Sequence, residues 1–312
     1  MFGRIADLTD EFSTQLTRFK IHSFDIFHQH QFYRKLRTEM EDREALVHVD
    51  FSENYTAKHS IAIQSTHFGA SQKQITLHTG VYYIGANSKP HTFCSISDSM
   101  EHGPAAIWTH LGPVLDEMQQ NFPSVDTVHF YSDGPTTQYR QKFNFYMLST
   151  ILAERKYRLG TWNFHESGHG KGAPDGIGAA IKRLADKAVA SGKDVTSASV
   201  LYDTLKESQT SISLFIISVD EIQLAVAKLK GAAVKPVPGT MRVHQVLTQC
   251  HSKISHRVLS CLCKKEICSC LGKCDFAFDD KEVASKTKNG LHKDSRHSDK
   301  TKRSSSKIPC EK

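Results

Sequence analysis

The chain has 312 residues, of which 39% are hydrophobic and 23% are charged, and its formal net charge is +7. This length and composition predict a soluble protein with one large domain, or a core domain with appended segments. No stretch is apolar over the roughly 18 residues of a membrane-spanning helix, and the first residues lack the apolar region of a signal peptide. We therefore expect an intracellular protein without a membrane partner, whose positive charge is compatible with binding nucleic acid.

The predicted elements fall into four segments along the chain. Apolar residues recur with helical spacing over residues 5–45, so we assign residues 1–44 to a helical N-terminal arm. Residues 45–240 form the predicted core domain, and residues 241–276 contain short strands and clustered cysteines. Residues 277–312 are rich in Lys and Arg and poor in apolar residues, so we expect a disordered basic tail.

The core domain begins with strands and continues with alternating helices and strands. Alternating β-branched and aromatic residues predict strands at 45–52, 73–85 and 91–99, followed by an amphipathic helix at 105–122. Strand, helix, strand and helix then follow in turn. This order predicts an α/β domain with a mixed sheet flanked by helices, and it is also the order of elements in the ribonuclease-H-like fold.

Five of the eight cysteines lie close together near the C-terminal end of the predicted core. They follow the spacing C-x-C-x4-C-x-C-x3-C and are Cys261, Cys263, Cys268, Cys270 and Cys274. Thiolates two residues apart are poor disulfide partners, but they can converge on one tetrahedral ion, so we predict a structural Zn²⁺ site. The alternative is a set of free thiols on a basic turn. The spacing leaves the ligand set open, because Cys250, His251 and His256 are near enough to contribute.

Two aspartates occupy strand positions. Asp50 lies inside an apolar strand, where a charge is costly unless it is paired, bound to metal or hydrogen-bonded to backbone amides. Asp133 lies where the fourth strand ends, in an Asp-Gly-Pro sequence that is common in turns. The ribonuclease-H-like fold carries catalytic carboxylates in the middle of the first strand and at the end of the fourth. We therefore predict that both aspartates bind Mg²⁺ or Mn²⁺.

A glycine-rich loop, "ESGHGKGAPDGIG", joins the fifth predicted strand to a helix. It does not fit the Walker phosphate loop, because that pattern requires Ser or Thr after the lysine, whereas Lys171 is followed by Gly172. It does not fit a dinucleotide-binding fingerprint either, because Gly168, Gly170 and Gly172 alternate. The loop instead leads into a helix whose first turn contains an acid.

Two acids compete for the role of third metal ligand. Asp175 lies in the first helical turn, where a carboxylate commonly satisfies free backbone amides, but where it could also point toward Asp50 and Asp133. Glu166 follows the fifth strand directly. In the ribonuclease-H-like fold the third acid lies on the helix after the fifth strand, which favours Asp175.

Several segments together resemble a known family. The order of acids on this strand pattern resembles DDE-type transposases and integrases of the ribonuclease-H-like superfamily. More narrowly, "VHVDFSENYTAK", "FYSDGPTTQYRQKFNFY" and the cysteine-rich ending look like transposon-derived proteins of animal genomes, over about residues 30–275. The resemblance implies DNA strand cleavage or transfer with two divalent cations, DNA as partner and a nuclear location. An aspartate as third acid departs from the more usual glutamate, and the N-terminal segment lacks an obvious complete DNA-binding domain.

Four cations flank the predicted carboxylate site and could contact phosphate, or could simply be solvated: Arg140, Lys142, Lys171 and Lys182. His169, between glycines, could assist catalysis or hydrogen-bond the acids. Three functions stay open: an enzyme that cleaves or joins DNA, a non-catalytic DNA or chromatin binder derived from a transposase, and a metal-dependent nuclease acting on RNA or structured DNA. A homo-oligomer is compatible with each of them.

Overall fold

The computed structural model describes most of the chain. The described residues are 4–61, 72–166, 168, 172–263 and 268–278. Two predicted site residues, His169 and Lys171, and almost all of the predicted basic tail lie outside them. No helix in the described ranges is long and apolar enough to cross a membrane.

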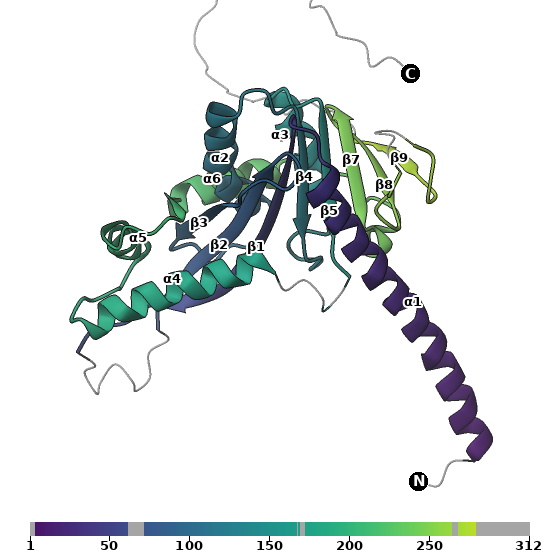
Figure 1. Cartoon of the computed structure of the whole chain (residues 1–312), viewed down its shortest axis with the longest axis horizontal. Helices are drawn as coiled ribbons and strands as arrows, with labels where there is room; N and C mark the ends of the chain where they lie inside the picture. The colour runs from purple at the N-terminus through teal and green to yellow at the C-terminus, as the bar shows by residue number, and fades with distance from the viewer. Residues whose placement is uncertain (1–3, 62–71, 167, 169–171, 264–267, 279–312) are drawn as a thin grey trace, which may run out of the picture.

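One sheet runs through the described part of the chain, and helices cover both of its faces (Figure 1). Its strands are β1 (Glu44–Thr56), β2 (Gln74–Ile84), β3 (His91–Ser97), β4 (Thr127–Ser132), β5 (Leu159–Phe164), β6 (Ser213–Ile216), β7 (Gln245–Cys250), β8 (Lys253–Arg257) and β9 (Cys274–Ala277). The helices are α1 (Ile5–Glu39), α2 (Pro104–Asn121), α3 (Lys142–Glu154), α4 (Ala173–Ala190), α5 (Ala198–Glu207) and α6 (Val219–Lys230). The predicted α/β architecture, a mixed sheet flanked by helices, is confirmed.

The nine strands lie in the order β6-β3-β2-β1-β4-β5-β7-β8-β9. β1 is antiparallel to β2 and parallel to β4, and β5 continues parallel to β4. Beyond β5, the strands β7, β8 and β9 add an antiparallel extension. β9 belongs to the cysteine-rich segment, for which no strand is predicted. β1, which carries Asp50, therefore lies in the interior of the sheet.

Two apolar layers hold the helices on the sheet. On one face, Leu111 of α2 and Leu148 of α3 pack with Phe130 of β4. On the other face, Ile181 of α4 and Leu201 of α5 belong to a second buried cluster. β4 and β5 are buried at all six of their positions, which explains their nearly continuous apolar composition, since a strand covered on both faces need not alternate.

β1 is longer than predicted. The sequence indicates a loop after Ser52, but the strand continues to Thr56, with a register irregularity between Ser52 and Tyr55. The Tyr55 ring is buried in the layer beneath α4, and its hydroxyl donates to Asp186 at 3.0 Å. The polar residues that suggest a loop thus flank a bulge, which lets the strand resume with an aromatic anchor.

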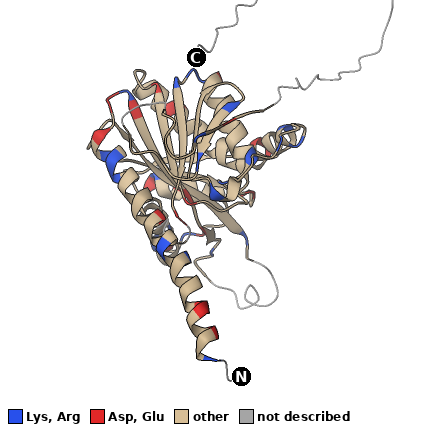
Figure 2. Ribbon diagram, turned by 90° about the vertical axis from the view of Figure 1, so that its right-hand side faces the viewer, with Lys and Arg blue, Asp and Glu red and all other residues tan. Residues whose placement is uncertain are grey.

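The predicted N-terminal arm is one long helix, α1. Its inner part packs on the sheet, where Phe32 and Met40 share a buried cluster with Leu46 and Tyr131. Its outer part projects away from the body, as Figures 1 and 2 show from two directions. Residues 5–21 include no buried side chain.

Candidate functional site

Asp50 and Asp133 come from neighbouring parallel strands. His48 of β1 is in register with Tyr131 of β4, and the two aspartates follow two residues later on each strand. Because side chains alternate between the faces with a period of two, this register predicts both carboxylates on the same face at the same level. Asp50 is still within β1, whereas Asp133 directly follows the last residue of β4.

The first turn of α4 is fixed against the same strands. The Thr79 hydroxyl of β2 donates to the carbonyl of Pro174 at 3.0 Å. At Gly178 the helix comes so close to β1 that an added Cβ would lie 2.1 Å from Ser52 Oγ, so only glycine permits this approach. These contacts hold Asp175 beside the strands that carry the other two acids.

Asp175 fulfils the ordinary role predicted for it and also reaches the site. Its Oδ2 accepts a hydrogen bond from the Gly172 backbone N–H at 2.8 Å, which satisfies a free amide at the start of α4. Its charge also acts on the ionisation of Asp50 and Asp133. The two interpretations of Asp175 are therefore compatible.

The environment disfavours ionisation of the two strand aspartates. Burial, followed by the charges of Asp133 and Asp175, raises the pKa of Asp50 to about 7. Burial also raises the pKa of Asp133 to about 6, with Arg140 opposing the rise and Asp175 adding to it. In the described part of the chain, the buried Oδ1 of Asp133 has no hydrogen-bond partner. The two aspartates are therefore partly buried acids whose neighbouring negative charges oppose ionisation.

The three carboxylates nevertheless do not converge as tightly as the cysteines. Groups of three or more His, Cys, Asp or Glu residues can hold a metal ion when their ligand atoms all lie within 4.8 Å of one another. Within the described ranges, the only such group is formed by cysteines. Asp175 is exposed, whereas Asp50 and Asp133 are partly buried. The arrangement is thus one of neighbouring acids that repel each other, rather than a closed cage.

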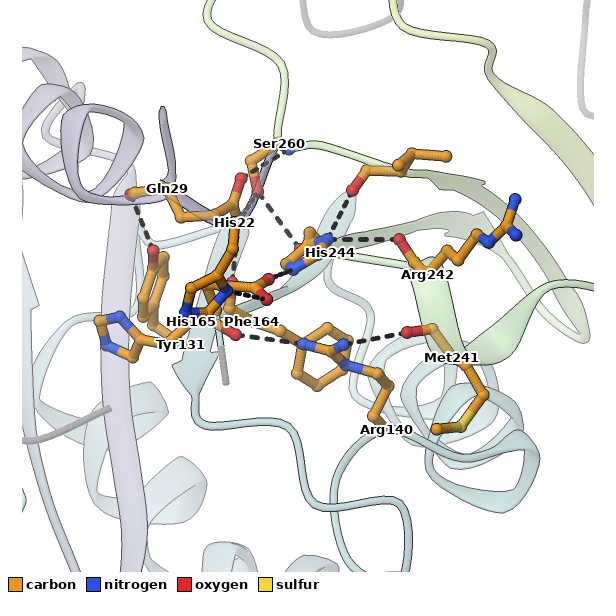
Figure 3. A network of polar contacts seen from close by, with 12 residues as sticks. His22, Gln29, Tyr131, Arg140, Phe164, His165, Met241, Arg242, His244 and Ser260 are labelled. Carbon is orange, nitrogen blue, oxygen red and sulfur yellow. Dashed lines mark hydrogen bonds and ion pairs between the residues drawn. The ribbon is translucent and has the colours of Figure 1, made fainter. Parts of the chain in front are cut away.

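Glu166, the competing third acid, belongs to a different network with His22 and His244, the two histidines labelled in Figure 3. Its two oxygens lie 2.9 Å from His22 Nδ1 and 2.6 Å from His244 Nε2. Burial acts to raise the pKa of Glu166, but the hydrogen bonds from His22 and His244 outweigh it and lower the pKa. Glu166 therefore joins α1 to the end of β5 and to the residue before β7. Sequence reasoning could not identify these partners, because the contacts span 144 and 78 residues.

The predicted phosphate-binding cations have structural partners. Arg140 is only 8% exposed and donates to the backbone carbonyls of His165 at 3.1 Å and Met241 at 3.2 Å (Figure 3). The structure thus places the Arg140 guanidinium in the interior, which disfavours the predicted contact with phosphate. The side chains of Lys142 and Lys182 are more exposed to solvent than that of Arg140.

Lys142 donates to the carbonyl of Val234 at 2.7 Å, and its ammonium lies 4.9 Å from the centre of the Phe143 ring. Lys182 on α4 forms an ion pair of 3.3 Å with the highly exposed Glu53. An exposed ion pair of this kind contributes little to stability. Of the three predicted cations that the structure describes, Lys182 could therefore most readily exchange its partner for a phosphate.

Four of the five clustered cysteines come together: Cys261, Cys263, Cys268 and Cys270. The Sγ of Cys261 lies 3.1 Å from that of Cys263 and 3.2 Å from that of Cys268. Soft thiolates in this number suit a tetrahedral metal such as Zn²⁺. Cys274 is not in the group, and its Sγ lies 3.4 Å from the carbonyl oxygen of Gly272. The upstream candidates Cys250, His251 and His256 are not in the group either.

The cysteine cluster is anchored to the body through buried polar contacts. Arg257 donates to the carbonyl of Cys268 at 2.7 Å and lies 3.3 Å from its Sγ. On the other side, Gln29 of α1 and Ser260 exchange hydrogen bonds of 3.0 and 3.1 Å, and Lys35 donates to the carbonyl of Leu262. The segment that presents the thiols is thus held between α1 and β8.

Because the pKa of Asp50 is raised in the folded protein, we expect the free energy of unfolding to depend on pH through this residue. Because the folded state holds this proton more tightly than the unfolded chain, ionised Asp50 destabilises the fold as the pH rises from its ordinary value of 3.8 toward about 7. Asp50→Asn should therefore be neutral near pH 4 and stabilising by roughly 2–4 kcal/mol at pH 8 without added Mg²⁺. Urea unfolding of both proteins at both pH values measures this difference. Equal differences at the two pH values would refute it.

Comparisons with known proteins give one match. No curated protein and no solved structure matches the chain. A family model described as "Domain of unknown function (DUF8701)" matches residues 29–260. This range contains Asp50, Asp133, Glu166 and Asp175, and it ends directly before the first clustered cysteine. Since the match covers most of the chain, the protein belongs to the DUF8701 family.

Proposed function

We propose that the protein cleaves or joins DNA strands by metal-dependent phosphoryl transfer. The observation that carries this proposal is the placement of three acids by the core: Asp50 within β1, Asp133 directly after the parallel neighbour β4, and Asp175 in the first turn of α4, which is bonded to β2. Perturbed carboxylates that are grouped by the fold are typical of catalytic sites. A DNA substrate would also account for the basic tail and would imply a nuclear protein.

The strand order supports a ribonuclease-H-like core. The strands β3-β2-β1-β4-β5 are adjacent in this order, with β2 antiparallel to its neighbours and helices following β3, β4 and β5. The acids lie within β1, directly after β4 and in the first turn of α4, which are the positions expected of that fold. Both of the oxygens of Glu166 are engaged by histidines, so we assign the third position to Asp175.

The three carboxylates would hold Mg²⁺ or Mn²⁺. Such ions, when bound, neutralise charge on the phosphate and polarise the attacking and leaving oxygens. Asp50 provides a partly buried oxygen donor, and Asp133 provides a buried Oδ1 without another partner in the described part of the chain. Asp175 keeps one oxygen on the Gly172 amide, which fixes its orientation and leaves the other oxygen for a ligand.

Incubation of the full chain with end-labelled duplex DNA, single-stranded DNA and RNA tests the proposal. We expect strand cleavage of DNA only when Mg²⁺ or Mn²⁺ is present. Cleavage of RNA alone would identify the protein as a ribonuclease instead. Absence of any product on all three substrates, with protein shown to be folded, would contradict the enzymatic proposal.

A second candidate function is a non-catalytic DNA-binding protein. It is favoured by the observation that, in the described ranges, cysteines form the only group of three or more His, Cys, Asp or Glu residues whose ligand atoms all lie within 4.8 Å of one another. Such a protein would bind DNA with an affinity that falls steeply as salt increases, because Lys and Arg contacts release counterions. Binding without cleavage in the assay above would favour this candidate.

A further inference from the structure

The outer part of α1 presents large apolar side chains to solvent. The most exposed on one side are Ile5, Leu8, Phe12 and Phe19, with exposed fractions of 84%, 71%, 64% and 64%. No residue of this outer part is buried, and Figure 1 shows it extending away from the sheet. An isolated projecting helix with such a surface lacks the tertiary packing from which most helices gain their stability. The surface therefore fits a partner.

The apolar residues follow a seven-residue repeat. Ile5, Phe12, Phe19 and Ile26 are spaced by seven, and Leu8 and Leu16 lie on the same side of the helix at three- or four-residue spacings. A repeat of this period aligns one seam along a helix and is typical of helices that pair side by side.

The charges beside this seam also repeat every seven residues, and their signs alternate. Arg4, Glu11, Arg18 and Asp25 each directly precede one of the seven-residue-spaced apolar residues. Figure 2 shows acidic and basic positions distributed along the projecting helix. A helix that met a partner of uniform charge would gain nothing from this alternation, so the pattern indicates a partner with the reverse order of charges.

We propose that the outer part of α1 pairs antiparallel with the same helix of a second copy of this chain. Reversing the helix places Glu11 beside the partner's Arg18, and it places Arg4 beside the partner's Asp25, a half-buried residue whose charge also interacts with Glu166 and His244 of its own chain. Both pairs are symmetric about the same point, between residues 14 and 15, so a single register pairs all four of the charges that directly precede the seven-residue-spaced apolar residues. The result is a two-fold symmetric interface, the commonest kind in homo-oligomers.

The antiparallel direction also agrees with the fold and the charges. α1 begins to contact its own body at His22, which lies 2.9 Å from Glu166, so the two bodies would lie at opposite ends of the paired segment. In a parallel pair the charged positions would instead face Thr9, Leu16 and Ser23, which carry no charge. Parallel pairing therefore leaves the alternation unexplained.

Charge-reversal variants of the full chain test the register. In Glu11→Arg, two attractive pairs become repulsive, and the same holds for Arg18→Glu. Each variant alone should dimerise about 30-fold more weakly than the parent at low salt. When the two variants are mixed, every pair again has opposite signs, so a one-to-one heterodimer should form. Sedimentation velocity of each protein alone and of the mixture measures this.

Substitution of an apolar residue by glutamine tests the seam formed by Ile5, Phe12, Phe19 and Ile26. Phe12→Gln should weaken dimerisation by at least about 100-fold, because both copies lose a buried ring. Ile21→Gln is the matched control, since Ile21 is 59% exposed but lies on the opposite side of the helix. Circular dichroism of each variant confirms that the body remains folded.

Three results would overturn the proposal. The first is a parent protein that stays monomeric at about 100 µM, well above the concentration at which a weak dimer forms. The second is a mixture of the two charge variants that associates no better than either alone. The third is an Ile21→Gln variant as impaired as Phe12→Gln, which would place the contact on another face. If α1 bound DNA in place of a second copy, Phe12→Gln would lose affinity for DNA. The parent and the variant would then sediment with the same mass in the absence of DNA.

Discussion

Asp50→Asn should reduce metal-dependent cleavage by the full chain by at least about 10³-fold, while leaving its affinity for DNA unchanged or slightly higher. The substitution keeps the size of the side chain but removes a charged oxygen ligand, and losing about 4 kcal/mol of transition-state stabilisation corresponds to this factor. Affinity should not fall, because the lost charge is negative and its neighbour on DNA is a phosphate. Cleavage of labelled duplex and filter binding across a salt series measure the two quantities.

The matched control for this prediction is Glu53→Gln on the same strand. Glu53 is an acid three residues from Asp50, but its side chain is 94% exposed and pairs only with Lys182 in the described part of the chain. We expect this variant to cleave at close to the parental rate. Asp50→Asn retaining more than about a tenth of the parental rate would remove Asp50 from the proposed machinery.

Removal of Zn²⁺ should destabilise the protein by several kcal/mol. Four thiols within 4.8 Å of one another, held between α1 and β8, repel one another as thiolates unless a cation binds them. Metal analysis should find one zinc per chain, and a strong chelator should lower the midpoint of thermal unfolding and free the thiols for titration. Re-addition of Zn²⁺ should restore both.

Two cysteine variants separate metal binding from a general effect of losing a thiol. Cys268→Ser removes a member of the group and should abolish stoichiometric zinc binding. Cys274→Ser removes a thiol of the same segment that is not in the group, and it should bind zinc as the parent does. Equal zinc content in all three proteins would contradict the assignment of the four ligands.

Local patterns predicted the core of the fold, but not its long-range polar contacts. Asp50 could be placed in a strand because its apolar neighbours alternate, and Asp133 could be placed at a strand end because a turn sequence follows it. The relation of Glu166 to His22 could not be predicted, because it depends on how α1 crosses the sheet. The position of Arg140 was missed for the same reason, since a buried arginine and a surface arginine look alike in a sequence.

The reciprocal hydrogen bonds between Gln29 and Ser260 have a consequence for the order of events during synthesis. They join residues 231 positions apart, so the inner part of α1 finds its polar partners only after nearly the whole core has left the ribosome. The apolar contacts of Phe32 with Leu46 and Tyr131 need only β1 and β4, so they can form before these polar contacts are complete. The first helix made is thus among the last elements to complete its contacts with the core.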